Sequence, residues 1–411
     1  MSEHIIDRVF VLLSQKRFSE ANNLLNDLLR ESPNDSEYLR LSSHIAQQLG
    51  DLTKALNQAN ASIAADPNSS LSHYTKCNVL LELDKLREAK ISINKAILLA
   101  PLDADNYALL AHLYFREKQY DKALESANDA LAFEPENLLA LNTRSSALLK
   151  LGNHDESFKT IEGALREDPN DSNTHANYGW NLLESGDHKK ALIHFSEALK
   201  NNPNSSFAQA GMMEALKARY VVYRWFLKYS FWISNLTSKN QWVVIIGFYV
   251  GYRIINTLAK SYPVLVPLSV LLMVIALSTW VITPISNLFL RLNKFGRHML
   301  DKEEMTSSTL VGISLLVGLI SGISFLFLDL PFLLSTAIFG VTMMIPLSSM
   351  FSNSKNKWLL PAYTVCLGLL GLSSILTTFS TQNLATPTAT LYLLGFFAYQ
   401  WVANFTIIHK N

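Results

Sequence analysis

The side chains that could support catalysis or metal binding are few and scattered in this sequence. A serine nucleophile requires a histidine that takes its proton, but Ser321, in the apolar segment GLISG, is followed by no histidine in any later apolar segment. The zinc-binding spacing HExxH is absent. The histidines of the first half stand at no spacing typical of metal ligands: His4, His44, His73, His112, His154, His175, His188 and His194. We therefore predict a protein that is not an enzyme and needs neither a metal nor another cofactor.

Charged residues divide the sequence into two halves of opposite net charge. Residues 1–218 hold 22 lysines and arginines against 30 aspartates and glutamates, whereas residues 219–411 hold 13 against 4. An acidic first half argues against binding to nucleic acid, which requires a basic surface. The two cysteines, Cys77 and Cys366, lie in different halves, so no disulfide framework is expected. The N-terminal residues lack the cleavage site of a signal peptide, and we expect the first half to stay in the cytoplasm.

Six prolines recur at intervals of 34 residues across the first half, at positions 33, 67, 101, 135, 169 and 203. A fixed period of this length indicates stacked helical hairpins. We interpret each proline as closing one hairpin and as lying in the first turn of the next helix, where proline is favoured. Gly50, Gly152 and Gly186 fall midway between prolines, where we predict the tight turn inside a hairpin.

Small side chains recur in phase with these prolines. Twelve residues before each proline stand Ala21, Ala55, Ala89, Ala123, Ser157 and Ala191. Twenty-four residues before each proline stand Val9, Ser43, Cys77, Ala111, Ser145 and Gly179. Small residues at these positions let neighbouring helices approach closely, and larger ones such as Leu80, Leu148 and Phe195 are expected to fill the remaining space.

With this pattern, residues 2–217 resemble the tetratricopeptide repeat family. Most repeats here lack the aromatic residue that is usual early in the first helix. The first repeat also carries Val9 and Leu28 where small residues are normal. The resemblance implies an α-solenoid of about six repeats. A capping helix over residues 207–217 is expected to close it.

The resemblance also implies a groove, lined mainly by the first helix of each hairpin, that binds an extended peptide or a helix of a cytoplasmic protein partner. Carrying the groove positions across gives Arg40, His44, Tyr74, Asn78, His112, Arg116, Asn142, Lys150, Asn177 and Trp180. The asparagines are expected to bond to a partner's backbone, and Arg40 and Arg116 to meet its carboxylates. The lysine, asparagine and arginine set with which chaperone-binding members hold a terminal carboxylate is absent.

The second half consists of long apolar segments, which are typical of membrane spans. Six of them approach the ~20 residues that cross a bilayer: 242–259, 264–285, 308–328, 332–350, 358–379 and 388–408. Eleven lysines and arginines around these segments then fall on one side and only Lys260 on the other, which predicts that both the N- and the C-terminus are cytoplasmic. Residues 219–241, rich in aromatic and basic side chains, and residues 286–305 are expected to form helices at the cytoplasmic membrane surface, in contact with lipids.

The sequence thus predicts an all-α fold: an N-terminal tetratricopeptide α-solenoid over residues 1–218, an interfacial linker over 219–241 and a six-helix transmembrane bundle over 242–411. This layout resembles bacterial proteins that join such repeats to a multi-pass domain in the inner cell membrane. Our first hypothesis for its function is a membrane-anchored scaffold or adaptor. The alternative is a transporter, channel or lipid-handling protein regulated by its repeats, because proline and glycine in spans also occur at transport sites.

Overall fold

The computed structural model describes residues 2–236, 238–290, 300–351 and 358–408, and nearly all of them are helical. The chain divides into two compact units. The first contains Met1–Asn181 and Ile193–Ala208, and the second contains Leu182–Leu192 and Gln209–Asn411. The all-α fold predicted from the sequence is confirmed for the described residues.

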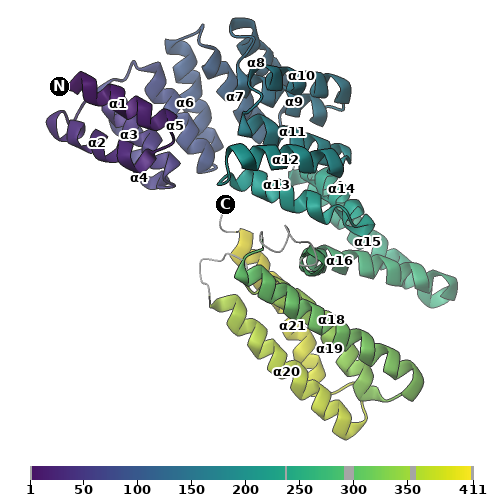
Figure 1. Cartoon of the computed structure of the whole chain (residues 1–411). Coiled ribbons are helices and arrows are strands. Elements are labelled where there is room, and N and C mark those ends of the chain that lie inside the picture. Colours follow the sequence, from purple (N-terminus) through teal and green to yellow (C-terminus); the bar gives the residue numbers. More distant parts are fainter. Residues whose placement is uncertain (1, 237, 291–299, 352–357, 409–411) are drawn as a thin grey trace. The chain divides into compact units, whose positions relative to one another are not determined.

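The first unit is a stack of helical hairpins that follow one another in chain order (Figure 1). Its helices, the last three of which continue into the second unit, are α1 Ser2–Ser14, α2 Phe18–Glu31, α3 Ser36–Gln48, α4 Leu52–Ala65, α5 Ser70–Glu82, α6 Leu86–Leu99, α7 Ala104–Arg116, α8 Tyr120–Phe133, α9 Leu138–Lys150, α10 His154–Glu167, α11 Ser172–Ser185, α12 His188–Asn201 and α13 Ser206–Lys217. From α3 to α13 the first helices begin at intervals of 34 residues, which is the spacing of the prolines. The capping helix predicted over 207–217 is α13.

Each first helix starts with a capping residue rather than with the proline. Pro33 lies in the turn, whereas Asp35 is the N-cap of α3 and accepts a hydrogen bond from Tyr38 N over 3.0 Å. Asn137 caps α9 in the same way through Ala140 N. The prediction that proline lies in the first turn of the next helix is therefore wrong. That turn instead follows an N-cap residue, whose side chain accepts hydrogen bonds from the exposed N–H groups of the turn.

The turn inside each hairpin requires one residue with positive φ. Gly50, Gly152 and Gly186 adopt φ of 82°, 87° and 95°, as the sequence predicted. The same position in the other hairpins is occupied by residues with a side chain, Lys16, Asp84 and Lys118, at φ of 59°, 58° and 60°. This conformation costs a non-glycine residue roughly 1–2 kcal/mol. The turn is therefore imposed by the packing of the hairpin.

The small residues in phase with the prolines form the core between helices. Ser145 on α9 and Ser157 on α10, both fully buried, show how close the helices come, since each hydroxyl donates to the other's backbone oxygen, over 2.9 and 2.8 Å. Gly179 on α11 faces the ring of Phe195 on α12, which is also fully buried. Close approach of the two helices thus depends on small side chains, as predicted.

The second unit continues with long helices (green to yellow in Figure 1). They are α14 Val221–Asn235, α15 Ser238–Ser261, the short 3-10 helix η1 Pro263–Leu265, α16 Val266–Leu290, α18 Lys302–Leu328, α19 Pro331–Ser349, α20 Leu359–Thr381 and α21 Pro387–Ile408. Among the described residues, three helices, α18, α19 and α20, are long and apolar enough to cross a membrane. The surface helix predicted over 286–305 lies partly outside the described residues, at 291–299.

The apolar helices pack through small residues and hydroxyl groups. Gly318 on α18 and Gly340 on α19 meet backbone to backbone, and Ser314 Oγ donates to Gly340 O over 2.7 Å. From α21, the fully buried Tyr399 shares a hydrogen bond of 3.0 Å with Ser349 on α19. Interhelical contacts of this kind hold helices together where an apolar surrounding supplies no hydrophobic driving force.

Candidate functional site

A cavity of about 870 Å³ opens along the first helices of the repeats, and we call it the repeat cavity. Its walls come from α5, α7, α9, α11 with its N-cap, and α13, all of which are first helices or the capping helix. The residues that line it are Glu82, His112, Phe115, Arg116, Leu138, Leu139, Asn142, Thr143, Ser146, Asp171, Asn173, Asn177 and Phe207. Four of the ten predicted groove residues are among them: His112, Arg116, Asn142 and Asn177.

Six of the nine lining residues that the sequence analysis missed share repeat positions with one another or with residues that it identified. Ser146 stands 34 residues after His112, Thr143 stands 34 before Asn177, and Glu82 stands 34 before Arg116. A further position contributes Leu139, Asn173 and Phe207 at the same interval. Equivalent positions of a stacked repeat lie on one face. The 34-residue register therefore contained a signal for these six residues.

Asn142 is the polar group at the centre of this lining. Its side chain is 6% exposed, and its Nδ2 donates to Thr174 Oγ1 over 2.9 Å. The Thr174 hydroxyl in turn donates to Asp171 Oδ2 over 2.6 Å, so the threonine oxygen must accept from Asn142. This fixes the amide orientation and leaves Asn142 Oδ1, which is buried, without a hydrogen-bond partner among the described residues. A buried acceptor without a donor costs ~1–3 kcal/mol.

The charged residues of the repeat cavity are already paired within the chain. Arg116 forms an ion pair of 3.0 Å with Asp84, and Glu82 accepts from Gln47 Nε2 over 2.6 Å. Asp171 caps α11 through Thr174 N at 2.7 Å. Glu82 and Asp171 outnumber Arg116 among the lining residues, so the cavity keeps a small net negative charge although each charged group is engaged. We therefore expect hydrogen bonding more than net charge to select its ligand.

His112 contributes a neutral imidazole to the cavity wall. Burial, and then the positive charge of Arg116, lower the pKa of His112 to about 4. At pH 7 the ring therefore offers one N–H donor and one acceptor. On α12, outside the cavity, burial and then His175 lower the pKa of His194 to about 4 as well.

The low pKa of His112 predicts a loss of stability in acid. An unfolded histidine titrates near 6.5, so the unfolded state takes up the proton first as the pH falls. The stabilisation is complete above pH 6.5 and is lost between pH 6.5 and about 4. We expect the loss to be on the order of 2 kcal/mol, with allowance for partial exposure. Chemical unfolding of the full chain at pH 7 and pH 4.5 measures it, and His112→Gln should shrink the difference, leaving the share that His194 contributes. An unchanged pH dependence in that variant would contradict the assignment.

The other six predicted groove residues lie on first helices outside the repeat cavity. Arg40 is held by Glu37 at 2.6 Å, and burial followed by the charge of Arg40 lowers the pKa of His44. Burial raises the pKa of Tyr74 to about 12, against an opposing hydrogen bond with Asn78. Lys150 ends α9. Trp180 Nε1 donates to Phe207 O over 3.3 Å, at the rim that Phe207 forms.

Among the described residues, no three histidine, cysteine, aspartate or glutamate side chains gather closely enough to hold a metal ion. Among the described lining residues, neither hydroxyl, Thr143 or Ser146, is hydrogen-bonded to His112 or to a carboxylate. What its lining can do is bind: amides, hydroxyls and a neutral imidazole offer donors and acceptors beside the apolar surfaces of Phe115, Leu138, Leu139 and Phe207. Such a lining suits a polypeptide, whose backbone alternates donors and acceptors between apolar side chains.

Comparison with known families finds two models of the same repeat in this part of the chain. One tetratricopeptide repeat model matches residues 10–70, and another matches residues 114–178. Protein NPGR2 of Arabidopsis thaliana is 25% identical over 167 residues, which cover 35% of this chain and 23% of that protein. The chain therefore spans about a quarter of the length of this relative.

Two solved structures align with about half of this chain. A chain of the APC/C hetero-tetramer Cut9–Hcn1 aligns with a TM-score of 0.45 and 16% identity, over 53% of this chain and 43% of that one. A tetratricopeptide repeat protein from Parabacteroides merdae aligns with a TM-score of 0.45 and 16% identity, over 51% of this chain and 82% of its own.

Proposed function

We propose that this chain, whose N-terminal half carries a tetratricopeptide repeat segment, is a membrane-anchored scaffold that holds an extended segment of a protein partner in the repeat cavity. Tetratricopeptide repeats are generally interaction modules without catalytic activity, and the repeat segment supports a role in protein–protein interaction. The finer parts of the proposal are the cavity as binding site, the cytoplasmic partner and the membrane anchor.

The observation that carries the proposal is the lining of the repeat cavity, in which amide and hydroxyl groups such as Asn142 and Thr143 stand beside apolar side chains such as Leu139. The backbone of an extended peptide fits such a lining, because every residue except proline presents an N–H donor and every residue presents a carbonyl acceptor. Arg116 can bind a partner's carboxylate only in competition with Asp84, with which its guanidinium already forms an ion pair. A surface ion pair of that kind is worth ~0–1 kcal/mol, so the competition costs little.

For the second half we propose a membrane anchor of six spans, with both termini in the cytoplasm. Three described helices of suitable length and composition support membrane association. The segments 242–259, 264–285 and 388–408 are the further spans, and they fall in α15, in η1 with α16, and in α21. Eleven lysines and arginines then share one side: Arg219, Arg224, Lys228, Lys239, Arg291, Lys294, Arg297, Lys302, Lys355, Lys357 and Lys410.

The polar groups of the described bundle favour an anchor over a transporter. Helices α19 and α20 contain no acidic or basic residue. Some of their hydroxyls bond between helices: Thr342 bonds to Tyr392 OH at 2.6 Å, and Tyr363 OH donates to Gly395 O at 2.9 Å. Others bond to a backbone oxygen of their own helix, as Thr336 and Thr364 do. A transport path requires polar groups that face a substrate, whereas these hydroxyls are engaged within the bundle.

Photocrosslinking from the cavity tests the proposed function. A photoreactive amino acid replaces Asn173, which is exposed and lines the cavity, in the full chain expressed in cells. We expect crosslinks to a small set of defined proteins. Asn142→Leu in the same background should reduce these adducts about tenfold, as loss of one buried hydrogen bond implies.

Two controls make this result specific. The same photoreactive residue at Ile91, which is 73% exposed on α6, should give no such adducts. Asn94→Leu is the matched substitution on an exposed asparagine of α6, and it should leave the adducts from position 173 unchanged. Equal yields from positions 173 and 91, or equal losses in the two leucine variants, would refute binding in the repeat cavity.

A further inference from the structure

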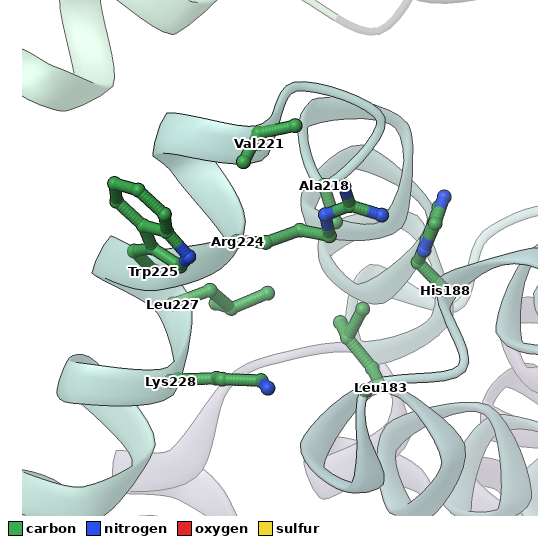
Figure 2. A pocket seen from close by; sticks show the side chains of 9 residues that line it. Leu183, His188, Ala218, Val221, Arg224, Trp225, Leu227 and Lys228 are labelled. Carbon is green, nitrogen blue, oxygen red and sulfur yellow. The ribbon is translucent and has the colours of Figure 1, made fainter.

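A second cavity, of about 270 Å³, lies within the second unit between helix α14 and the turn that joins α11 to α12, and we call it the linker pocket. Figure 2 shows Arg224, Leu227 and Lys228 extending from α14 toward Leu183 and His188, whereas the ring of Trp225 extends from the other side of the same helix. One water occupies ~30 Å³ in the liquid, so the linker pocket has room for a polar group much larger than a water molecule.

The charges that line this pocket are all positive. Arg224 and Lys228 are one helical turn apart on α14, and neither forms an ion pair among the described residues. The acidic residues of the facing turn are engaged elsewhere. Glu184 accepts from Asn235 Nδ2 over 3.0 Å, and Asp187 pairs with Lys190 at 3.7 Å and caps α12 through Lys190 N at 3.1 Å.

Both cations are held close to the facing turn. The Lys228 stem passes over Gly186, where an added methyl would lie 3.8 Å from Lys228 Cε. Burial, followed by the charge of Arg224, lowers the pKa of His188. His188 is therefore a neutral donor and acceptor beside two positive charges.

The floor of the pocket is apolar and buried, which strengthens electrostatic attraction inside it. Leu183, Ala218 and Leu227 are 3%, 1% and 7% exposed. Desolvated walls of this kind raise the local potential of the charges they surround. Two uncompensated cations in one such pocket repel each other, and an anion with several acceptor oxygens relieves that repulsion.

We propose that the linker pocket binds a phosphate group, through the Arg224 guanidinium, the Lys228 ammonium and the His188 imidazole. Phosphate monoesters carry ~−1.5 to −2 charges at pH 7 and three strong acceptor oxygens, which matches two cations and a neutral donor. A carboxylate offers one charge and two oxygens, and fits less well. The site is independent of the repeat cavity.

Calorimetric titration of the full chain in neutral maltoside detergent tests this proposal. The probes are inorganic phosphate, dihexanoyl phosphatidic acid and acetate. We expect saturable binding of a phosphate probe, and no binding of acetate at the same concentrations. Arg224→Gln/Lys228→Gln should weaken that binding at least about tenfold, because two charge-assisted contacts are lost.

The matched control is Arg219→Gln/Lys189→Gln, which removes the same charge from two exposed residues of the second unit outside the pocket. It should weaken binding by no more than about twofold, since screening limits distant surface charges. Lys228→Arg preserves the charge and should retain binding, which separates loss of the site from loss of the fold.

Every result decides the proposal. Binding of both phosphate probes assigns the site to the phosphate group itself, and binding of the phosphatidic acid alone assigns it to a lipid headgroup; each supports the inference. Binding of neither probe, acetate as good a ligand as phosphate, or equal losses in the two double variants would overturn it.

Discussion

Gly340→Ala is expected to destabilise the helical bundle of the second unit by about 2–4 kcal/mol. The added methyl would lie 2.6 Å from Gly318 N, 2.7 Å from Gly318 Cα and 2.8 Å from Ser314 O. All three are backbone atoms of α18, so no side chain can move aside. The two helices must separate, and the hydrogen bond of 2.7 Å from Ser314 Oγ to Gly340 O is lost with them.

Thermal unfolding of the full chain in mild detergent measures the effect, which should appear as a drop in Tm of roughly 5–10 °C. Gly322→Ala is the matched control on the same helix pair, because its methyl would meet only Ala337 Cβ at an ordinary 3.7 Å. Alanine is a better helix former than glycine by up to ~1 kcal/mol, so this control should be neutral or slightly stabilising. A Gly340→Ala protein as stable as the control would show that α18 and α19 do not cross at these glycines.

The contact between Gly318 and Gly340 also marks what the sequence can and cannot predict for the second half. The run from Gly318 to Gly322 predicts close helix packing, and Gly318 takes part in it. Its partner Gly340 could not be inferred, because apolar helices carry no periodic signal that pairs one residue with another. The hydroxyl pairs Thr342–Tyr392 and Ser349–Tyr399 were unpredictable for the same reason.

In the first half the sequence predicts far more, since each repeat confirms its neighbours. The 34-residue period predicts the hairpins and the turn glycines. The N-cap residues follow the same period, because Asp35, Asn137 and the residues equivalent to them precede every first helix after α1. The prolines are the more conspicuous repeat, but the capping residues are the ones whose side chains bond to the start of the helix.

Only four of the thirteen residues that line the repeat cavity were among the predicted groove residues, because a family's groove positions identify a face and not its depth. Arg40 and His44 lie on the first helix α3, but the cavity begins at α5. Ser146 and Thr143 were overlooked since small hydroxyls carry less obvious chemistry than asparagine or arginine. Asn142 Oδ1 has no partner because the amide of Asn142 is oriented by its hydrogen bond to Thr174 on the next repeat. That contact depends on how the repeats stack.

Gly179→Ala should destabilise the last hairpin in the natural sequence and stabilise it once Phe195 is removed. The added methyl would lie 2.7 Å from Phe195 Cε1 and 2.8 Å from Cδ1 and Cζ, inside the volume of a fully buried ring. We expect a loss of about 1–3 kcal/mol, which exceeds the ~1 kcal/mol by which alanine favours a helix over glycine. Phe195→Ala alone should cost about 3–5 kcal/mol, since it leaves a cavity in the same place.

In the Phe195→Ala background the methyl of Gly179→Ala enters that cavity. It then adds the helical preference of alanine and the burial of one methyl group, so the double variant should be about 1 kcal/mol more stable than Phe195→Ala. Chemical unfolding of the four proteins of this double-mutant cycle measures the reversal of sign. Because neither residue contacts a ligand in the proposed cavity, the test isolates packing. The same sign in both backgrounds would mean that α11 and α12 are not held at the distance that Gly179 permits.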